Sequence, residues 1–94
     1  MLYVTAIVHA QPEHVDAVGA ALNTLAIATR LEAGCERYEL FRKLGQPIFI
    51  THEIWASEEA ETAHIRGENV AILVSNIAQY MAAPAEIHRC SQIT

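Results

Sequence analysis

Hydrophobic and polar residues alternate over residues 2–10, a pattern typical of a β-strand. One parity holds Leu2, Val4, Ala6 and Val8, and the other holds Tyr3, Thr5, Ile7 and His9. The run Gln11-Pro12-Glu13 then breaks the strand, and proline suits the first turn of a helix. We therefore expect a strand that leads directly into a helix.

The expected helix has apolar residues at helical spacing: Val15, Val18, Leu22 and Leu25. Asp16 near its start and Arg30 near its end both suit the helix dipole. Gly34 is placed to end the helix in a left-handed conformation. Residues 35–44 predict a second strand, Gly45-Gln46-Pro47 a hairpin turn, and residues 48–56 a third strand.

The second half of the chain predicts two helical stretches and a last strand. Ser57 can cap the first of them, whose early turns carry the acidic residues Glu58, Glu59 and Glu61. Gly67 interrupts it, and Asn69 can cap a further helix that Pro84 stops. That helix carries on one side Leu73, Ile77, Tyr80 and Met81. Residues 85–93 form the expected final strand.

The order of elements is β-α-β-β-α-β, the plan of a ferredoxin-like α+β fold with helices on one face of an antiparallel sheet. We expect one domain over residues 1–94. Both parities of the first and third strands carry large apolar groups, whereas a sheet with one wet face alternates more cleanly. The bare face therefore predicts a homodimer in which two copies cover each other.

Composition narrows the function classes. The chain has a net charge of −5 and no basic stripe, which argues against nucleic acids and anionic membranes as partners. No apolar run approaches membrane-spanning length, and we expect a cytoplasmic protein. Cys35 and Cys90 lack metal-type spacing and are expected to be buried thiols.

The most informative stretch runs from Phe49 to Trp55, because it places His52 and Glu53 inside an apolar strand. Burying an unpaired charge is costly, so such residues are usually paired or functional. If Trp55 faces the helices, Glu53 and Thr51 do too, and His64 can approach them from the helix above. We expect these side chains to line an apolar pocket between helices and sheet.

Three segments resemble the antibiotic biosynthesis monooxygenase family. They are Thr29-Arg30-x-Glu32-x-Gly34-Cys35-x-x-Tyr38, Phe49-x-x-x-Glu53-x-Trp55-x-Ser57 and Ala63-His64. Glu53 and Trp55 match the E-x-W of the family, and His64 matches the first histidine of its A-H-x-x-x-x-H pattern. The second histidine of that pattern is Asn69 here, and the axial histidine of the haem-degrading branch is Val74, which cannot bind iron.

The resemblance implies a dimeric α+β barrel that oxidises a small aromatic phenol or quinol with molecular oxygen and no bound cofactor. His64 is the expected base, because an imidazole ordinarily titrates near neutral pH. Thr51 and Asn69 can hold substrate oxygens, and Trp55 can stack on the ring. The full expected substrate site is Tyr38, Thr51, Glu53, Trp55 and Asn69, with Tyr38 able to donate a proton.

Structural explanations remain open for each of these residues. His64 can pair with an acidic neighbour at a helix surface, and Trp55 can belong to the core. Tyr38 can lie with its tip at a sheet edge, and the Glu58–Glu61 segment can be a solvated helix start. Glu53 can pair across strands with one of three arginines, Arg37, Arg42 or Arg89. His9, His52 and His88 can form a metal cluster, although their spacing does not support one.

Two other functions also remain open. One is an isomerase or related proton-transfer enzyme acting on a small polar metabolite, which requires cations in the pocket for a phosphate, supplied by Arg30, Arg66 or Arg89. A dimer that binds a small apolar ligand without turnover requires only the pocket. Fold alone cannot choose among these functions, because one fold hosts many chemistries.

Overall fold

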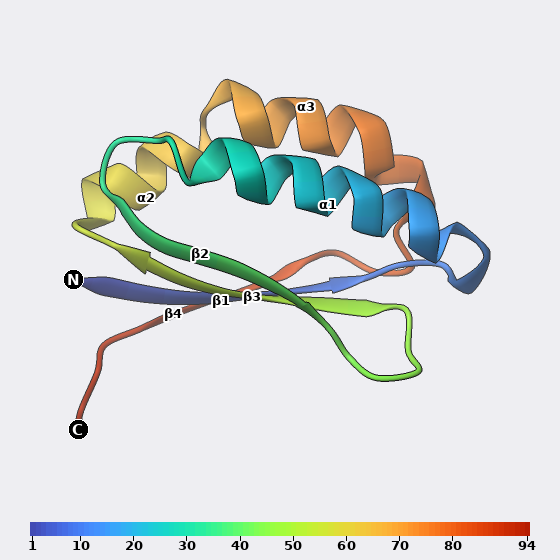
Figure 1. The fold of residues 1–94 in the computed structure, drawn as a ribbon, viewed down its shortest axis with the longest axis horizontal. Helices are drawn as coiled ribbons and strands as arrows, with labels where there is room; N and C mark the ends of the chain where they lie inside the picture. The colour runs from blue at the N-terminus through green and yellow to red at the C-terminus, as the bar shows by residue number, and fades with distance from the viewer.

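The computed structural model describes all 94 residues. It consists of a four-stranded antiparallel sheet with every helix on one face (Figure 1). The strands are β1 (Leu2–His9), β2 (Cys35–Arg42), β3 (Ile48–Trp55) and β4 (Glu86–Cys90), and their order is β2-β3-β1-β4. This order is that of a ferredoxin-like fold, so the predicted fold class is confirmed.

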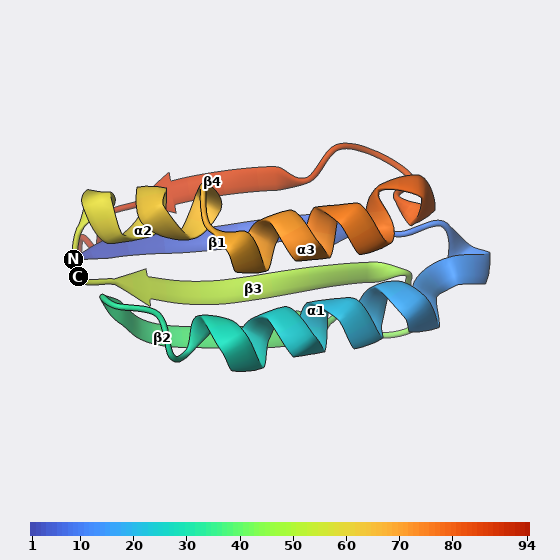
Figure 2. The same ribbon diagram turned by 90° about the horizontal axis from the view of Figure 1, so that it is seen from above.

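Three α-helices cover the sheet: α1 (Val15–Thr29), α2 (Glu58–Ile65) and α3 (Glu68–Ile77). Two short 3-10 helices, η1 (Pro12–His14) and η2 (Ala78–Tyr80), precede α1 and follow α3. Seen from above, α1 lies toward β2 and β3, whereas α2 and α3 lie over the β1 and β4 side (Figure 2). None of these helices has the length and apolar character that crossing a membrane requires.

The core lies between the helices and the sheet. It joins Val4 and Val8 of β1 to the apolar stripe of α1, Val18, Leu22, Leu25 and Ala26. Both Val18 and Trp55 are completely buried. Of the two parities that the alternation separates in this strand, the one with Val4, Ala6 and Val8 faces the helices.

Several predicted boundaries are wrong. Gly34 does have a left-handed φ of 80°, but α1 already ends at Thr29, and Gly34 lies in the turn before β2. A Cβ at Gly34 would lie 2.5 Å from that of Ala60, so the turn packs closely against α2. Asn69 does not cap α3, because Gly67 is the N-cap and Asn69 lies inside the helix. The α3 helix ends at Ile77, well before Pro84.

The helix start at Ser57 is as predicted, because its hydroxyl accepts a hydrogen bond from the Ala60 N–H at 3.1 Å. The two cysteines are not buried thiols. Cys35 is half-buried and Cys90 is exposed on β4, an edge strand on which every residue is exposed.

Candidate functional site

Three alternate residues of β3, Thr51, Glu53 and Trp55, face the helices and are buried. Their common orientation follows from the two-residue period of a strand, as the sequence predicted. The register places Glu53 opposite Val4 of β1 and opposite Tyr38 of β2. The Glu53 carboxylate is thus buried on β3, between the two strands that pair with it.

The Glu53 carboxylate has a neutral donor on each oxygen. The Trp55 indole N–H donates to Oε1 at 2.9 Å, and the Thr51 hydroxyl donates to Oε2 at 2.6 Å. The Thr51 oxygen in turn accepts the Ala6 backbone N–H at 2.9 Å. The predicted pairing of Glu53 with Arg37, Arg42 or Arg89 is therefore wrong, because the carboxylate points toward the helices and is bound there.

His64 approaches this network from α2, and its ring is only 4% exposed. The ring lies against the Trp55 indole with centroids 4.7 Å apart, and against the Tyr38 ring at 5.7 Å. The alternative expected His64 to lie at the helix surface, which is wrong because the ring is buried. It also expected His64 to pair with an acidic residue, which is correct.

The acidic partner is Glu32, from the segment between α1 and β2. Its Oε1 lies 2.8 Å from Nδ1 of His64, and its Oε2 accepts the Asn69 amide at 2.8 Å. The sequence analysis predicts no role for Glu32, although Glu32 lies in the first family-like segment. That segment is the only feature of the sequence that points to Glu32, because 32 residues separate it from His64.

The second nitrogen of His64 has no partner in the protein. Among side-chain oxygens and nitrogens that are fully buried, only Thr29 Oγ1 lacks a hydrogen bond. The Nε2 atom of His64 also lacks one but is not in that fully buried set, so it keeps a small contact with solvent. A carboxylate can only accept, so the neutral ring carries its proton on Nδ1. Nε2 is then a free lone pair beside two aromatic rings.

Tyr38 is buried, contrary to the alternative that placed its tip at a sheet edge. Burial raises the pKa of its phenol well above the ordinary value, and the neighbouring acidic groups of Glu53, Cys35 and Glu32 raise it further. Burial and the charge of Glu32 likewise raise the pKa of the Cys35 thiol. Both groups therefore stay protonated near neutral pH, and the Tyr38 hydroxyl is a donor rather than a base.

Glu61, expected in a solvated helix start, is 2% exposed. Both of its oxygens accept from Arg89 of β4, at 2.9 and 3.0 Å. The hydrogen bond to Glu61 raises the pKa of Arg89, which keeps its positive charge. Only Glu58 and Glu59 of the acidic run are exposed. This bidentate pair fixes α2 to the edge strand.

The predicted open pocket below His64 is absent. None of the larger hollows is lined by His64, Trp55 or Glu53, because these side chains fill the space between α2 and the sheet. One hollow of about 410 Å³ lies beside Tyr38, Arg30 and Cys35. The buried cluster therefore has a neighbouring hollow at its β2 side, which Tyr38 helps to line.

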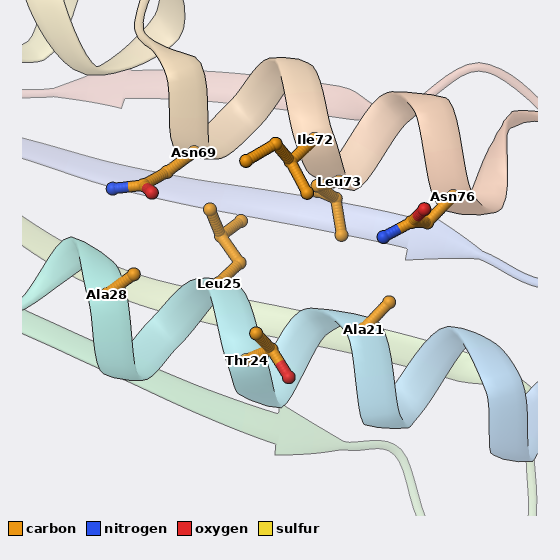
Figure 3. A pocket seen from close by; sticks show the side chains of 8 residues that line it. All are labelled: Ala21, Thr24, Leu25, Ala28, Asn69, Ile72, Leu73 and Asn76. Carbon is orange, nitrogen blue, oxygen red and sulfur yellow. The ribbon is translucent and has the colours of Figure 1, made fainter.

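A second groove, of about 140 Å³, separates α1 from α3. Figure 3 shows Asn69 and Asn76 of α3 reaching toward α1, with Ile72 and Leu73 between them. Asn69 contributes to this groove and, through its amide, also binds Glu32. The groove is thus connected to His64 through Asn69 and Glu32, but His64 does not line it.

The other histidines form no metal cluster. His9 and His52 are not neighbours, because the register pairs His9 with Ile48. His9 instead lies 2.9 Å from the Glu86 carboxylate, and His88 lies 3.5 Å from it. Hydrogen bonds from His9 and then His88 lower the pKa of Glu86, which is an exposed group on β4.

Comparisons with known proteins agree with the fold. No curated protein sequence matches the chain. A crystal structure of an antibiotic biosynthesis monooxygenase is 27% identical, with a TM-score of 0.93 and all of both chains covered. PA3566 from Pseudomonas aeruginosa is 23% identical (TM-score 0.91; 99% of this chain and 94% of that one). Rv0793 from Mycobacterium tuberculosis is 19% identical (TM-score 0.91; 99% and 95%). The last two show the fold alone.

A family model described as antibiotic biosynthesis monooxygenase matches residues 1–71, well over half of the chain. The match includes Glu32, Tyr38, the β3 network and His64. The chain therefore belongs to the antibiotic biosynthesis monooxygenase family.

Proposed function

We propose that this protein is a monooxygenase that oxidises a small aromatic phenol or quinol with molecular oxygen and uses no bound cofactor. One observation carries the proposal: in a chain of this family, a buried imidazole has one nitrogen on a carboxylate and the other free, beside the rings of Trp55 and Tyr38. A free imidazole nitrogen near aromatic surface suits the removal of a proton from a flat phenol.

The first step is proton transfer from the substrate hydroxyl to Nε2 of His64. The resulting phenolate donates one electron to O₂, which gives a phenoxyl radical and superoxide. The two combine to form a carbon–oxygen bond at a ring carbon, and a proton returned to the oxygen gives a hydroperoxide. Loss of the ring hydrogen and cleavage of the O–O bond then release water and leave a new carbonyl. The aromatic ring thus supplies all the electrons that reduce O₂.

The surroundings suit this sequence. His64 and Trp55 are almost fully excluded from water, which protects reactive intermediates from side reactions. The Tyr38 phenol, held protonated, can donate to the substrate oxygen. We propose that the substrate approaches through the hollow beside Tyr38, because Tyr38 is among the residues that line it and its ring centroid lies 5.7 Å from that of His64.

Thr51, Glu53 and Asn69 stay predicted substrate contacts. Their donors already serve other protein groups: Thr51 binds Glu53, and Asn69 binds Glu32. We propose that Thr51 and Glu53 act mainly by holding the Trp55 indole against the His64 ring.

The isomerase alternative gains no support from the arginines. Arg30 lines the hollow proposed for substrate approach, but its Nε donates to the backbone oxygen of Tyr38 at 2.9 Å. Arg89 is committed to Glu61, and Arg66 is exposed beyond α2. None of them contacts His64, so no cation is arranged for a phosphate beside the proposed base.

We further propose that the protein acts as a homodimer. The sheet face away from the helices carries partly exposed apolar side chains on three strands: Tyr3, Ile7, Phe41, Ile48, Ile50 and Ile54. Sedimentation should give a dimer for the wild type and a monomer for Ile50→Glu. Ile27→Glu, on the exposed side of α1, should stay dimeric; a monomeric wild type at micromolar concentration would reject the dimer.

The function is tested by oxygen uptake with a panel of phenols and hydroquinones, with ¹⁸O₂ used to follow one oxygen atom into the product. His64→Ala should lower kcat by about 10²–10⁴-fold, the usual contribution of a general base. His14→Ala is the matched control, because His14 lies at the other end of the sheet and stacks on Tyr80. Equal rates in the wild type and His64→Ala would reject the mechanism, and tight binding without turnover would favour a ligand-binding protein.

A further inference from the structure

We infer that Glu32 is the positioning residue that sets which nitrogen of His64 is free, and that Asn69 holds Glu32 for this task. The inference rests on the proposed function only for its catalytic consequence. Three separate segments meet at this carboxylate: the turn after α1 supplies Glu32, α2 supplies His64, and α3 supplies Asn69.

The backbone that carries Glu32 is itself fixed. The Glu32 N–H donates to the Thr29 oxygen at 2.9 Å, and the Glu32 oxygen accepts the Cys35 N–H at 3.2 Å. Two residues later, the Gly34 oxygen accepts the Ala56 N–H at 2.8 Å, which ties the turn to the end of β3. The carboxylate is therefore presented from a tight turn and not from a free loop.

Both oxygens of Glu32 are used, one by each helix. With Oε2 held by the Asn69 amide at 2.8 Å, the carboxylate cannot rotate away from Nδ1 without losing a hydrogen bond. A carboxylate donates nothing, so Nδ1 must carry a proton and Nε2 must carry the lone pair. A ring with the opposite tautomer would present an N–H to the substrate and could not act as a base.

Glu32 also suits the charged form of the base. After Nε2 takes a proton, the ring is positive and lies 2.8 Å from a negative oxygen. Of the other acidic groups around His64, Glu53 is bound by Trp55 and Thr51, and Glu61 on α2 is bound by Arg89. Glu32 is thus the carboxylate in direct contact with the imidazole.

Glu61 shows what a purely structural carboxylate looks like on the same helix. It is buried, it is fully bound, and its partner is an arginine that is always charged. Its replacement tests the attachment of α2 without touching His64. It is therefore the matched control for Glu32.

The first measurement is ¹⁵N NMR of the histidine side chains in the wild type, which reports the tautomer without any substrate. We expect neutral His64 to show the proton on Nδ1. In Glu32→Gln this preference should weaken or reverse, because a glutamine amide can offer an N–H to Nδ1 as well as an oxygen. In Glu61→Gln and in the exposed Glu36→Gln it should stay as in the wild type.

The second measurement is kcat with a substrate found by oxygen uptake. Glu32→Gln should lower kcat by about 10–100-fold, the size of effect known for removing the partner that orients a metal-binding histidine. Glu32→Asp, which keeps the charge, should recover part of this loss, and Asn69→Ala should lower kcat by less than Glu32→Gln. Glu61→Gln should lower the melting temperature but leave kcat close to the wild-type value.

The two hypotheses fail separately. If wild-type His64 carries its proton on Nε2, the assignment of Glu32 is wrong whatever the activity, and this result needs no variant to fold. If the tautomer and its dependence on Glu32 are as expected but no phenol or quinol is oxidised, the positioning role stands and the proposed function fails.

Discussion

Helices α1 and α2 cover the same sheet face but are held to it by opposite means. The α1 helix buries Val18, Leu22, Leu25 and Ala26, with Thr29 at its end. The buried residues of α2 are Glu61 and His64 only. Apolar burial stabilises the packing of a helix on the core but is non-directional. A hydrogen bond to a charged group instead fixes the orientation of the side chains that make it.

The difference shows what α2 is for. Arg89 binds Glu61 and Glu32 binds His64, so two polar contacts three residues apart join α2 to neighbouring segments. A helix attached in this way contributes little to the core but presents one imidazole in one orientation. The first pair contains an arginine, which keeps its positive charge, while the second contains an imidazole, which can take and return a proton.

The largest expected effect comes from breaking the apolar attachment of α1. Leu22→Ala should lower the free energy of unfolding by about 2–5 kcal/mol, the range for a buried leucine that leaves a cavity. Ile27→Ala, on the exposed side of the same helix, should change it by less than about 0.5 kcal/mol. Urea denaturation measures both. A loss at Leu22 no larger than that at Ile27 would contradict the contrast between the helices.

A smaller expected effect on the free energy of unfolding concerns Tyr38, whose ring contacts His64 of α2. Burial raises the pKa of Tyr38, so its neutral form is favoured in the folded state. Its contribution to stability is fully present below the unfolded pKa of about 10 and is lost as the pH rises above it, by at most about 1.4 kcal/mol per pH unit. Tyr38→Phe should remove this part of the alkaline loss.

The measurement for Tyr38 is the difference in unfolding free energy between wild type and Tyr38→Phe, taken at pH 8 and again at pH 11. The value at pH 8 is the internal control for lost packing and hydrogen bonding. A difference that stays constant between the two pH values would show that Tyr38 ionises as readily in the folded chain as in the unfolded one.

The smallest effect concerns the start of α2. Ser57→Ala removes the cap on the Ala60 N–H and should cost about 1 kcal/mol. Hydrogen exchange should show the loss mainly within α2, because this helix shares few apolar contacts with the core. Ser75→Ala, at an exposed site of α3, is the control. Uniform loss over α1 and α2 would mean that the two helices unfold together and are not held independently.

Hydrophobic spacing was sufficient for most of the fold. It located the four strands and the α1 stripe, and it placed Thr51, Glu53 and Trp55 on one face of β3, because these features depend on local geometry. It could not identify the buried side of α2, because that side is polar and carries no apolar stripe. Glu61 was therefore expected in solvent although it is buried.

The candidate site divides in the same way. The family-like segments pointed to His64, Tyr38 and Trp55, and the structure brings their rings together. The partners were not predictable: Glu32 is 32 residues from His64, and Arg89 is 28 from Glu61. Such pairs depend on strand order, register and the path of a turn, and no local pattern encodes these.

The sequence by itself determined which segments become strands and helices and which side of each is apolar, because side-chain period and capping are properties of neighbouring residues. Only the tertiary structure decided which carboxylate meets which base. Folding brings Glu32 to Nδ1 of His64, binds Glu53 with neutral donors and gives Glu61 an arginine. Three glutamates that look alike in the sequence thus acquire different charges around them, and with them different chemistry.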